Sequence, residues 1–84
     1  MVTPESIKAS IEQGLDCQQV DVAGDGHHFE ALIVSPAFRG LSRVARHRLV
    51  YQAMGERMRE EVHALSMTTL TPDEWAARKG ESHG

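Results

Sequence analysis

The sequence predicts a single α+β domain with the order helix, strand, strand, helix, strand, helix, in which three strands form one sheet with the helices packed on it. Three observations predict this class. The chain has 84 residues, the length of one small domain. Residues 29–34 form an apolar run typical of a buried strand, and capping signals at residues 3–5 and 71–74 mark two helix starts. We assign residues 1–79 to the domain and residues 80–84 to a disordered tail.

The first helix is expected to run from Pro4 to about Gln13. Thr3 is a suitable N-cap, a proline is favoured at the first helical position, and Gly14 is well placed to end the helix. Its apolar stripe is narrow, so Leu15 is expected to add to the packing at the helix end.

Two strands are expected next, at residues 17–22 and 29–34. The turn signal at residues 24–26, Gly-Asp-Gly, separates them, and such a short link favours an antiparallel hairpin. Residues 64–70 alternate well enough to predict a third strand.

A long helix is predicted to follow Ser42, which can cap it, and Gly55 is expected to weaken or kink it. The apolar residues that recur there at helical spacing are Val44, Tyr51, Met54, Met58 and Val62. The final helix is expected around Trp75, after the capping box with a proline inside it at residues 71–74.

Composition argues against several function classes. The net charge of -3 argues against a general polyanion binder, because affinity for nucleic acid depends on Lys and Arg contacts to phosphates. The single Cys17 excludes an intramolecular disulfide and favours a cytosolic, cytoplasmic setting. No apolar run approaches the roughly 20 residues that span a bilayer. A thin core and the lack of a nucleophile motif near Asp25 predict that the chain is not an enzyme.

Three histidines are candidate metal ligands. His27 and His28 fall in the hairpin loop, and His63 falls at the junction between the long helix and the third strand. The three would approach one another if the third strand lies beside the hairpin. The alternative is that His28 packs at the strand start, His27 is solvated and His63 satisfies a helix C-terminus. His47, inside the helix, is interpreted as structural.

A local basic region is the second candidate site. Four arginines occur in a stretch without any acidic residue between positions 31 and 55: Arg39, Arg43, Arg46 and Arg48. Such a face can bind phosphate or an acidic partner, and arginine suits bidentate contacts. The alternative is a solvated helix face.

Four segments together carry a resemblance to a known family: FRGLSRV at residues 38–44, RHRLVY at 46–51, VHALS at 62–66 and LTPDEW at 70–75. On these motifs, which lie in a match that spans nearly the whole chain, the sequence resembles the BolA family. The loop GDGHHF at residues 24–29 makes it most similar to the IbaG/YrbA-like subgroup.

The resemblance implies a fold similar to a type II KH domain and a cytoplasmic partner of monothiol glutaredoxins, with roles in iron–sulfur cluster trafficking, iron homeostasis and the stress response. In the family's picture the two proteins share a [2Fe-2S] cluster, to which the glutaredoxin and its glutathione supply thiolates. The histidine that this chain would supply is His63, with His27 or His28 as the second ligand. The loop is short and has no cysteine, which departs from the family pattern.

The resemblance also implies a second function, a DNA-binding transcriptional regulator that would use the arginines of the long helix. Against it stand the net acidity and the absence of a G-x-x-G backbone clamp at residues 40–43. A weak homodimer and a divalent metal held by the three histidines alone are further alternatives.

Overall fold

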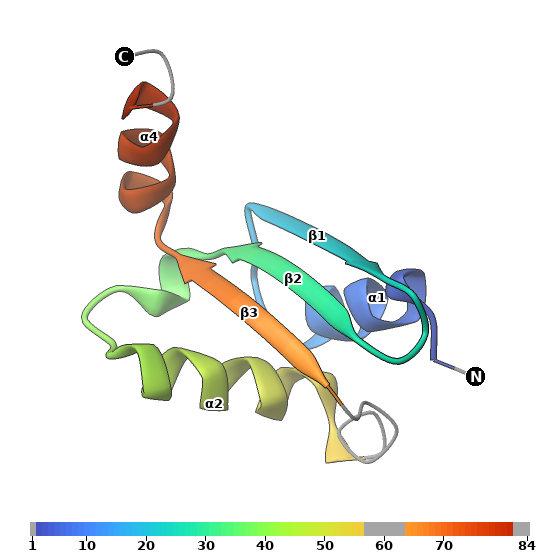
Figure 1. The fold of residues 1–84 in the computed structure, drawn as a ribbon. Helices are drawn as coiled ribbons and strands as arrows, with labels where there is room; N and C mark the ends of the chain where they lie inside the picture. Colours follow the sequence, from blue (N-terminus) through green and yellow to red (C-terminus); the bar gives the residue numbers. More distant parts are fainter. Residues whose placement is uncertain (1, 57–63, 82–84) are drawn as a thin grey trace.

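The structure is a computed structural model that describes residues 2–56 and 64–81 (Figure 1). The described elements follow the predicted order and confirm the α+β class: α1 (Pro4–Gly14), β1 (Gln19–Gly24), β2 (Phe29–Val34), a 3-10 turn η1 (Pro36–Phe38), α2 (Arg43–Met54), β3 (Leu65–Leu70) and α4 (Pro72–Glu81).

The three strands form one mixed sheet in the order β1-β2-β3. β1 and β2 make the predicted antiparallel hairpin, in which Gly24 lies opposite Phe29. β3 pairs with β2 in parallel, with Leu65 opposite Phe29 and Leu70 opposite Val34. A parallel neighbour requires a crossover connection, and α2 lies within it.

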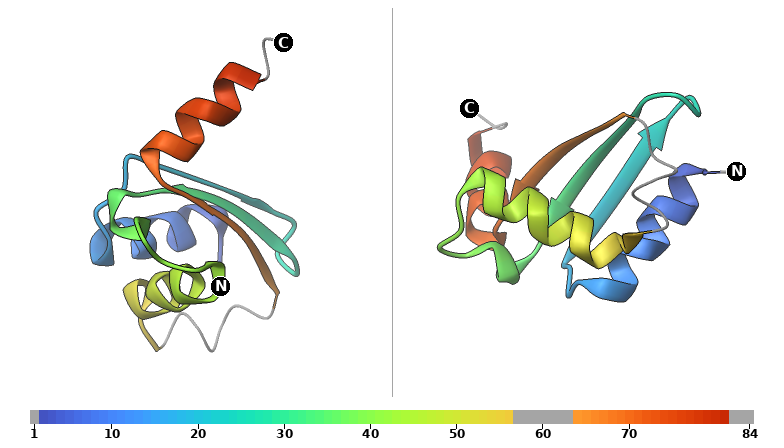
Figure 2. Two further views of the ribbon diagram at one scale, coloured as in Figure 1. Left: turned by 90° about the vertical axis from the view of Figure 1, so that its left-hand side faces the viewer. Right: turned by 90° about the horizontal axis from the view of Figure 1, so that it is seen from below.

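The core lies between the sheet and the two helices on one of its faces, α1 and α2 (Figure 2). Side chains from every layer meet there with almost no exposed surface, among them Ile7, Ile11, Ile33, Phe38 and Val50. α1 and α2 approach closely where α1 ends, since a Cβ added at Gly14 would collide with the backbone of Ala53. α1 ends at Gly14, as predicted, and the absence of a side chain there permits this close crossing. α4 extends from the end of the sheet, away from the helix layer (Figure 1).

The predicted caps are confirmed. The Thr3 hydroxyl accepts a hydrogen bond from the Ser6 N–H at 3.1 Å. The Ser42 hydroxyl accepts one from the Ala45 N–H at 3.2 Å. Each satisfies one of the free donors at a helix start.

Several predicted boundaries are wrong. β1 begins at Gln19 rather than residue 17 and keeps Gly24 in its ladder, because the turn is made by the residues after it. α2 ends at Met54, where Gly55 has a φ of 86°, so the glycine ends this helix rather than bending it. Met58 and Val62 lie outside the described residues. α4 ends at Glu81, inside the segment assigned to the tail.

Val44 is also placed wrongly by the periodicity, since it is 63% exposed. Val50 and Met54, one turn apart, are the buried residues of α2. An α-helix turns by about 100° per residue, so the spacing from Val44 to Val50 places their side chains about 120° apart around the helix axis. Val44 therefore does not share the buried face of α2, although its spacing from Tyr51 is helical.

Candidate functional site

The loop between β1 and β2 is fixed by a single carboxylate. One oxygen of Asp25 accepts hydrogen bonds from the backbone N–H of His27 and of His28, both at 2.9 Å. The Asp25 N–H donates to the carbonyl of His28 at 3.2 Å, and Gly26 has a φ of 99°. The bonds from His28 and then His27 lower the pKa of Asp25. The loop backbone is therefore held in place by Asp25.

The side chains of His27 and His28 are both exposed. All the hydrogen bonds just described use the backbone, so they leave the imidazole nitrogens of both residues uncommitted. The alternative in which His28 packs at the strand start is wrong, because Phe29 is the residue that enters the core there. His27 is solvated, as that alternative expected.

His63 lies outside the described residues. The residue that follows it in the chain, Ala64, is described, and its carbonyl accepts a hydrogen bond from the Phe29 N–H at 2.9 Å. Phe29 is in turn the residue that follows His28. The third strand therefore does lie beside the hairpin, as the approach of the three histidines required.

The residues at 2–56 and 64–81 contain no group of three or more His, Cys, Asp and Glu side chains that could hold a metal ion. Cys17 is half-buried, and burial, followed by the charges of Glu12 and Asp16, raises the pKa of its thiol to about 11. Cys17 is therefore a thiol rather than a thiolate ligand at neutral pH.

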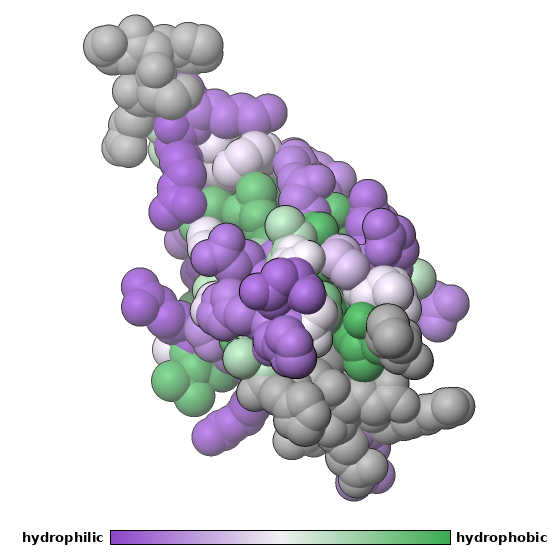
Figure 3. All heavy atoms as spheres, turned by 45° about the vertical axis from the view of Figure 1, so that its right-hand side comes forward, coloured by the Kyte–Doolittle hydropathy of each residue, from purple (hydrophilic) through white to green (hydrophobic). Residues whose placement is uncertain are grey.

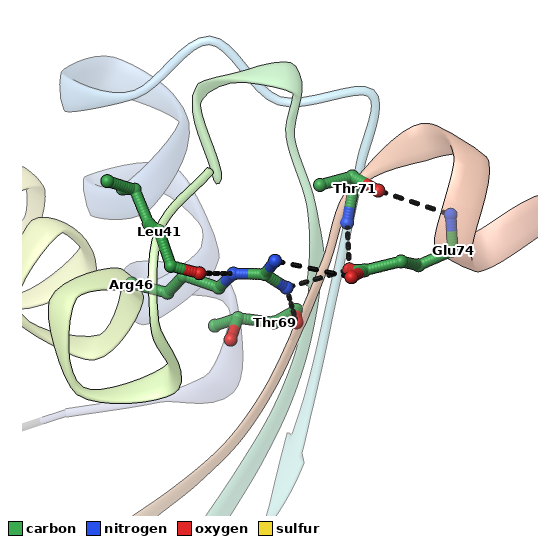
Figure 4. Close-up of polar contacts among 5 residues, drawn as sticks. All are labelled: Leu41, Arg46, Thr69, Thr71 and Glu74. Carbon is green, nitrogen blue, oxygen red and sulfur yellow. Dashed lines mark hydrogen bonds and ion pairs between the residues drawn. The ribbon is translucent and has the colours of Figure 1, made fainter. Parts of the chain in front are cut away.

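The junction between α2 and α4 is built around Arg46 (Figure 4). Its Nε donates to the Leu41 carbonyl at 2.9 Å and its Nη1 to the Thr69 carbonyl at 3.0 Å. The same guanidinium forms two bonds with the Glu74 carboxylate, at 2.7 and 3.2 Å. Its side chain is only 13% exposed. Arg46 therefore ties α2, β3 and α4 together.

Glu74 also completes the predicted capping box. It accepts from the Thr71 N–H at 2.8 Å, and the Thr71 hydroxyl accepts from the Glu74 N–H at 3.2 Å. The hydrogen bond from Arg46, and then that from Thr71, lowers the pKa of Glu74 to about 2.

The basic face differs from its prediction. Arg46 is committed to the junction, and Arg39 forms a looser ion pair with Asp73 at 3.9 Å, with both side chains exposed. Arg43 and Arg48 are exposed on α2. The run without acidic residues was misleading because the partners come from α4, which is distant in sequence and close in space.

A groove of about 720 Å³ lies between α2, β3 and α4. Its charged lining residues are Arg43, Arg46, Glu74 and Arg78, with His47 beside them. The sequence did not single out Arg78, because nothing local distinguishes it from any other cation in a helical last turn. His47, interpreted as structural, is half-buried, and its Nε2 is buried with no hydrogen-bond partner within the described part of the chain.

Two further surface features of the described residues carry fewer charged groups that could hold a ligand. Hydrophilic side chains cover most of the face seen in Figure 3, and hydrophobic ones form small separate areas. A second hollow, of about 420 Å³, lies over the open face of the sheet near Asp21, Glu30 and Leu32. Within residues 2–56 and 64–81, no helix has the length and apolar character needed to cross a membrane.

The chain is similar to several known proteins in sequence and in fold. A family model described as BolA-like protein matches residues 2–74. The acid stress protein IbaG of Escherichia coli K12 is 38% identical over 71 residues, covering 83% of this chain and 84% of that protein. The structure of a BolA protein homologue from Coxiella burnetii is 51% identical, with a TM-score of 0.80, over 90% of this chain and 99% of that one.

A regulator is also among the relatives. The protein named DNA-binding transcriptional regulator BolA from Vibrio cholerae is 42% identical over 59 residues, which cover 70% of this chain and 56% of that protein. This chain therefore matches only about half of that regulator's length. These relatives are named as a stress protein and a regulator, and none of them is named as an enzyme.

Proposed function

The chain belongs to the BolA-like family, and from this premise we propose that it is an adaptor that binds a monothiol glutaredoxin and shares a [2Fe-2S] cluster with it. His63 would supply one ligand from this chain, and His27 or His28 the other. The glutaredoxin and glutathione would supply thiolates. The bound cluster would make the pair a carrier in iron–sulfur trafficking.

The observation that carries this proposal is the hydrogen bond between the Phe29 N–H and the Ala64 carbonyl, at 2.9 Å. It joins the residue after His28 to the residue after His63. The backbone that follows one candidate ligand is therefore hydrogen-bonded to the backbone that follows the other. The register of β2 with β3 continues from this point along both strands.

The donor chemistry of the loop fits a shared cluster. His27 and His28 offer exposed imidazoles on a backbone held by Asp25. Imidazoles replace thiolates on one iron of Rieske-type clusters, where they raise the reduction potential. Because imidazole protonates near pH 6.5, we expect cluster retention to weaken as the pH falls.

The experiment is to reconstitute a cluster on a monothiol glutaredoxin with glutathione, add this protein, and record visible absorption and circular dichroism spectra. We expect a new spectrum that saturates at a one-to-one ratio and is lost in His63→Ala. His27→Ala and His28→Ala, tested singly, identify the loop ligand.

His83→Ala is the matched control, because it removes an imidazole that is not among the candidate ligands. A spectrum that His63→Ala leaves unchanged, or that His83→Ala alters equally, would contradict the assignment of the ligands.

A second candidate function is binding of DNA by α2. It is favoured by the exposure of Arg43 and Arg48 on this helix and by the name of the Vibrio cholerae relative. Because Arg46 is bonded within the molecule, only the exposed arginines remain for phosphates. Fluorescence anisotropy with duplex DNA should then show affinity that falls steeply with salt, and a smaller salt slope in Arg48→Gln. Undetectable binding near physiological ionic strength would remove this candidate.

A further inference from the structure

The groove between α2, β3 and α4 is at the opposite end of the sheet from the histidine loop. The loop precedes Phe29, which lies opposite the first residue of β3, whereas the groove is lined by Met67, Thr68, Thr69 and Leu70 towards the end of that strand. A ligand in this groove would therefore occupy a site separate from the proposed cluster ligands.

The charge of the groove is positive. Arg43 enters from α2 and Arg78 from α4, so cations line two of its walls. Glu74 is the only carboxylate that lines it among the described residues, and it is already neutralised by two bonds from Arg46 (Figure 4). Neither Arg43 nor Arg78 forms an ion pair with a described carboxylate, and both are exposed. Two guanidinium groups are therefore available to an anion.

The remaining lining can take a less polar body. Leu41, Met67 and Ala77 contribute apolar surface, and the imidazole of His47 lies among them with its Nε2 unbonded. A volume of about 720 Å³ lies within the usual range for small-molecule sites. Such a site combines apolar lining with a few polar groups that fix the orientation of the ligand.

We propose that this groove binds a small phosphate ester of about the size of a mononucleotide, with Arg43 and Arg78 on the phosphate and the apolar lining against the organic body. Guanidinium groups favour phosphate because their planar donors can engage two of its oxygens at once. Arg46 is a positioning residue here, since it ties the first turn of α4 to α2 through Glu74 and cancels the charge of that carboxylate.

The test uses the whole chain and isothermal titration calorimetry with adenosine monophosphate, ribose 5-phosphate, inorganic phosphate and adenosine. An ionic strength of about 0.15 M limits long-range attraction between charges. We expect saturable one-site binding of adenosine monophosphate, weaker binding of the two smaller phosphates and none of adenosine. Amide chemical shifts should change around Arg43, Thr68 and Arg78 and not around His27.

Arg43→Gln and Arg78→Gln should each weaken binding of adenosine monophosphate by about tenfold, the size expected for one charge-assisted contact. Arg48→Gln is the matched control: it removes an exposed arginine of α2 that does not line the groove, and the affinity should not change. Circular dichroism of each variant verifies that it is folded.

Three outcomes would overturn the proposal. The first is no saturable binding of any phosphate ester at concentrations on the order of 10 mM. The second is an equal loss in Arg48→Gln and Arg43→Gln, which would indicate unspecific attraction by α2. The third is amide shifts around the groove with a short DNA duplex that adenosine monophosphate does not displace, which would make the groove a nucleic-acid surface.

Discussion

The β1–β2 loop and the junction of α2 with α4 are each held by a carboxylate that accepts more than one hydrogen bond. In the loop, Asp25 bonds only backbone N–H groups, so the neighbouring side chains of His27 and His28 remain exposed. In the junction, Glu74 bonds the side chain of Arg46, and that side chain is only 13% exposed. A carboxylate that accepts hydrogen bonds from the backbone fixes a loop and leaves the side chains of that loop available to ligands. A carboxylate that bonds a side chain gives that side chain a structural role and makes it unavailable to a ligand.

The largest effect that would test this contrast is expected from Arg46→Met. The substitution leaves the carbonyls of Leu41 and Thr69 without their donor, and the free energy of unfolding should fall by about 2 kcal/mol. Urea denaturation measures the change. Arg48→Met is the control, because its side chain is exposed, and its midpoint should equal that of the wild type. Equal losses in the two variants would show that the junction does not hold the fold.

A smaller effect, visible as a pH dependence, is expected from Glu74→Gln. Folding lowers the pKa of Glu74 from 4.5 to about 2, so the ionised carboxylate stabilises the fold above pH 4.5. This contribution should be lost as the pH falls from about 4.5 to about 2. Denaturation of wild type and Glu74→Gln should therefore give a constant difference above pH 5 that shrinks below it. A difference independent of pH would contradict the role of the charge.

Asp25→Ala should change the loop without unfolding the domain. It removes the acceptor of the His27 and His28 N–H groups, so hydrogen exchange of these two amides should accelerate while that of the core strands stays unchanged. Asp25→Asn keeps an oxygen at the same position and is expected to restore most of the protection. Unchanged exchange in Asp25→Ala would show that the loop is held by other contacts.

The smallest effect on stability is expected from His27→Ala and His28→Ala. Both side chains are exposed, so urea midpoints should match the wild type even where cluster binding is lost. A clear loss of stability in either variant would make that histidine structural and weaken its candidacy as a ligand.

Local signals in the sequence predicted the elements well. Residues 29–34 were assigned as a strand with the bounds that the structure shows, and the capping box at Thr71 and Glu74 is present with both of its hydrogen bonds. Caps, turns and alternation depend on neighbours in the chain, so their signals can be read directly.

The sites were less predictable because their partners are distant in sequence. Arg46 looked like one of four equivalent cations, and only the docking of α4 brings Glu74 to it. The groove and Arg78 depend on the same docking. The exposure of His27 was easier to anticipate, since a short polar turn keeps its side chains outside the core, whereas His28, directly before the strand, was equally compatible with packing at the strand start.

The parallel pairing of β2 with β3 bears on how the chain folds. The β1–β2 hairpin closes over a four-residue loop, from Asp25 to His28, and hairpins form within about 1–10 μs. β3 can join only after the chain containing α2 has crossed over, which costs more loop-closure entropy and slows the step. The sheet is therefore expected to grow from the hairpin outward, with its β2–β3 edge completed late in refolding.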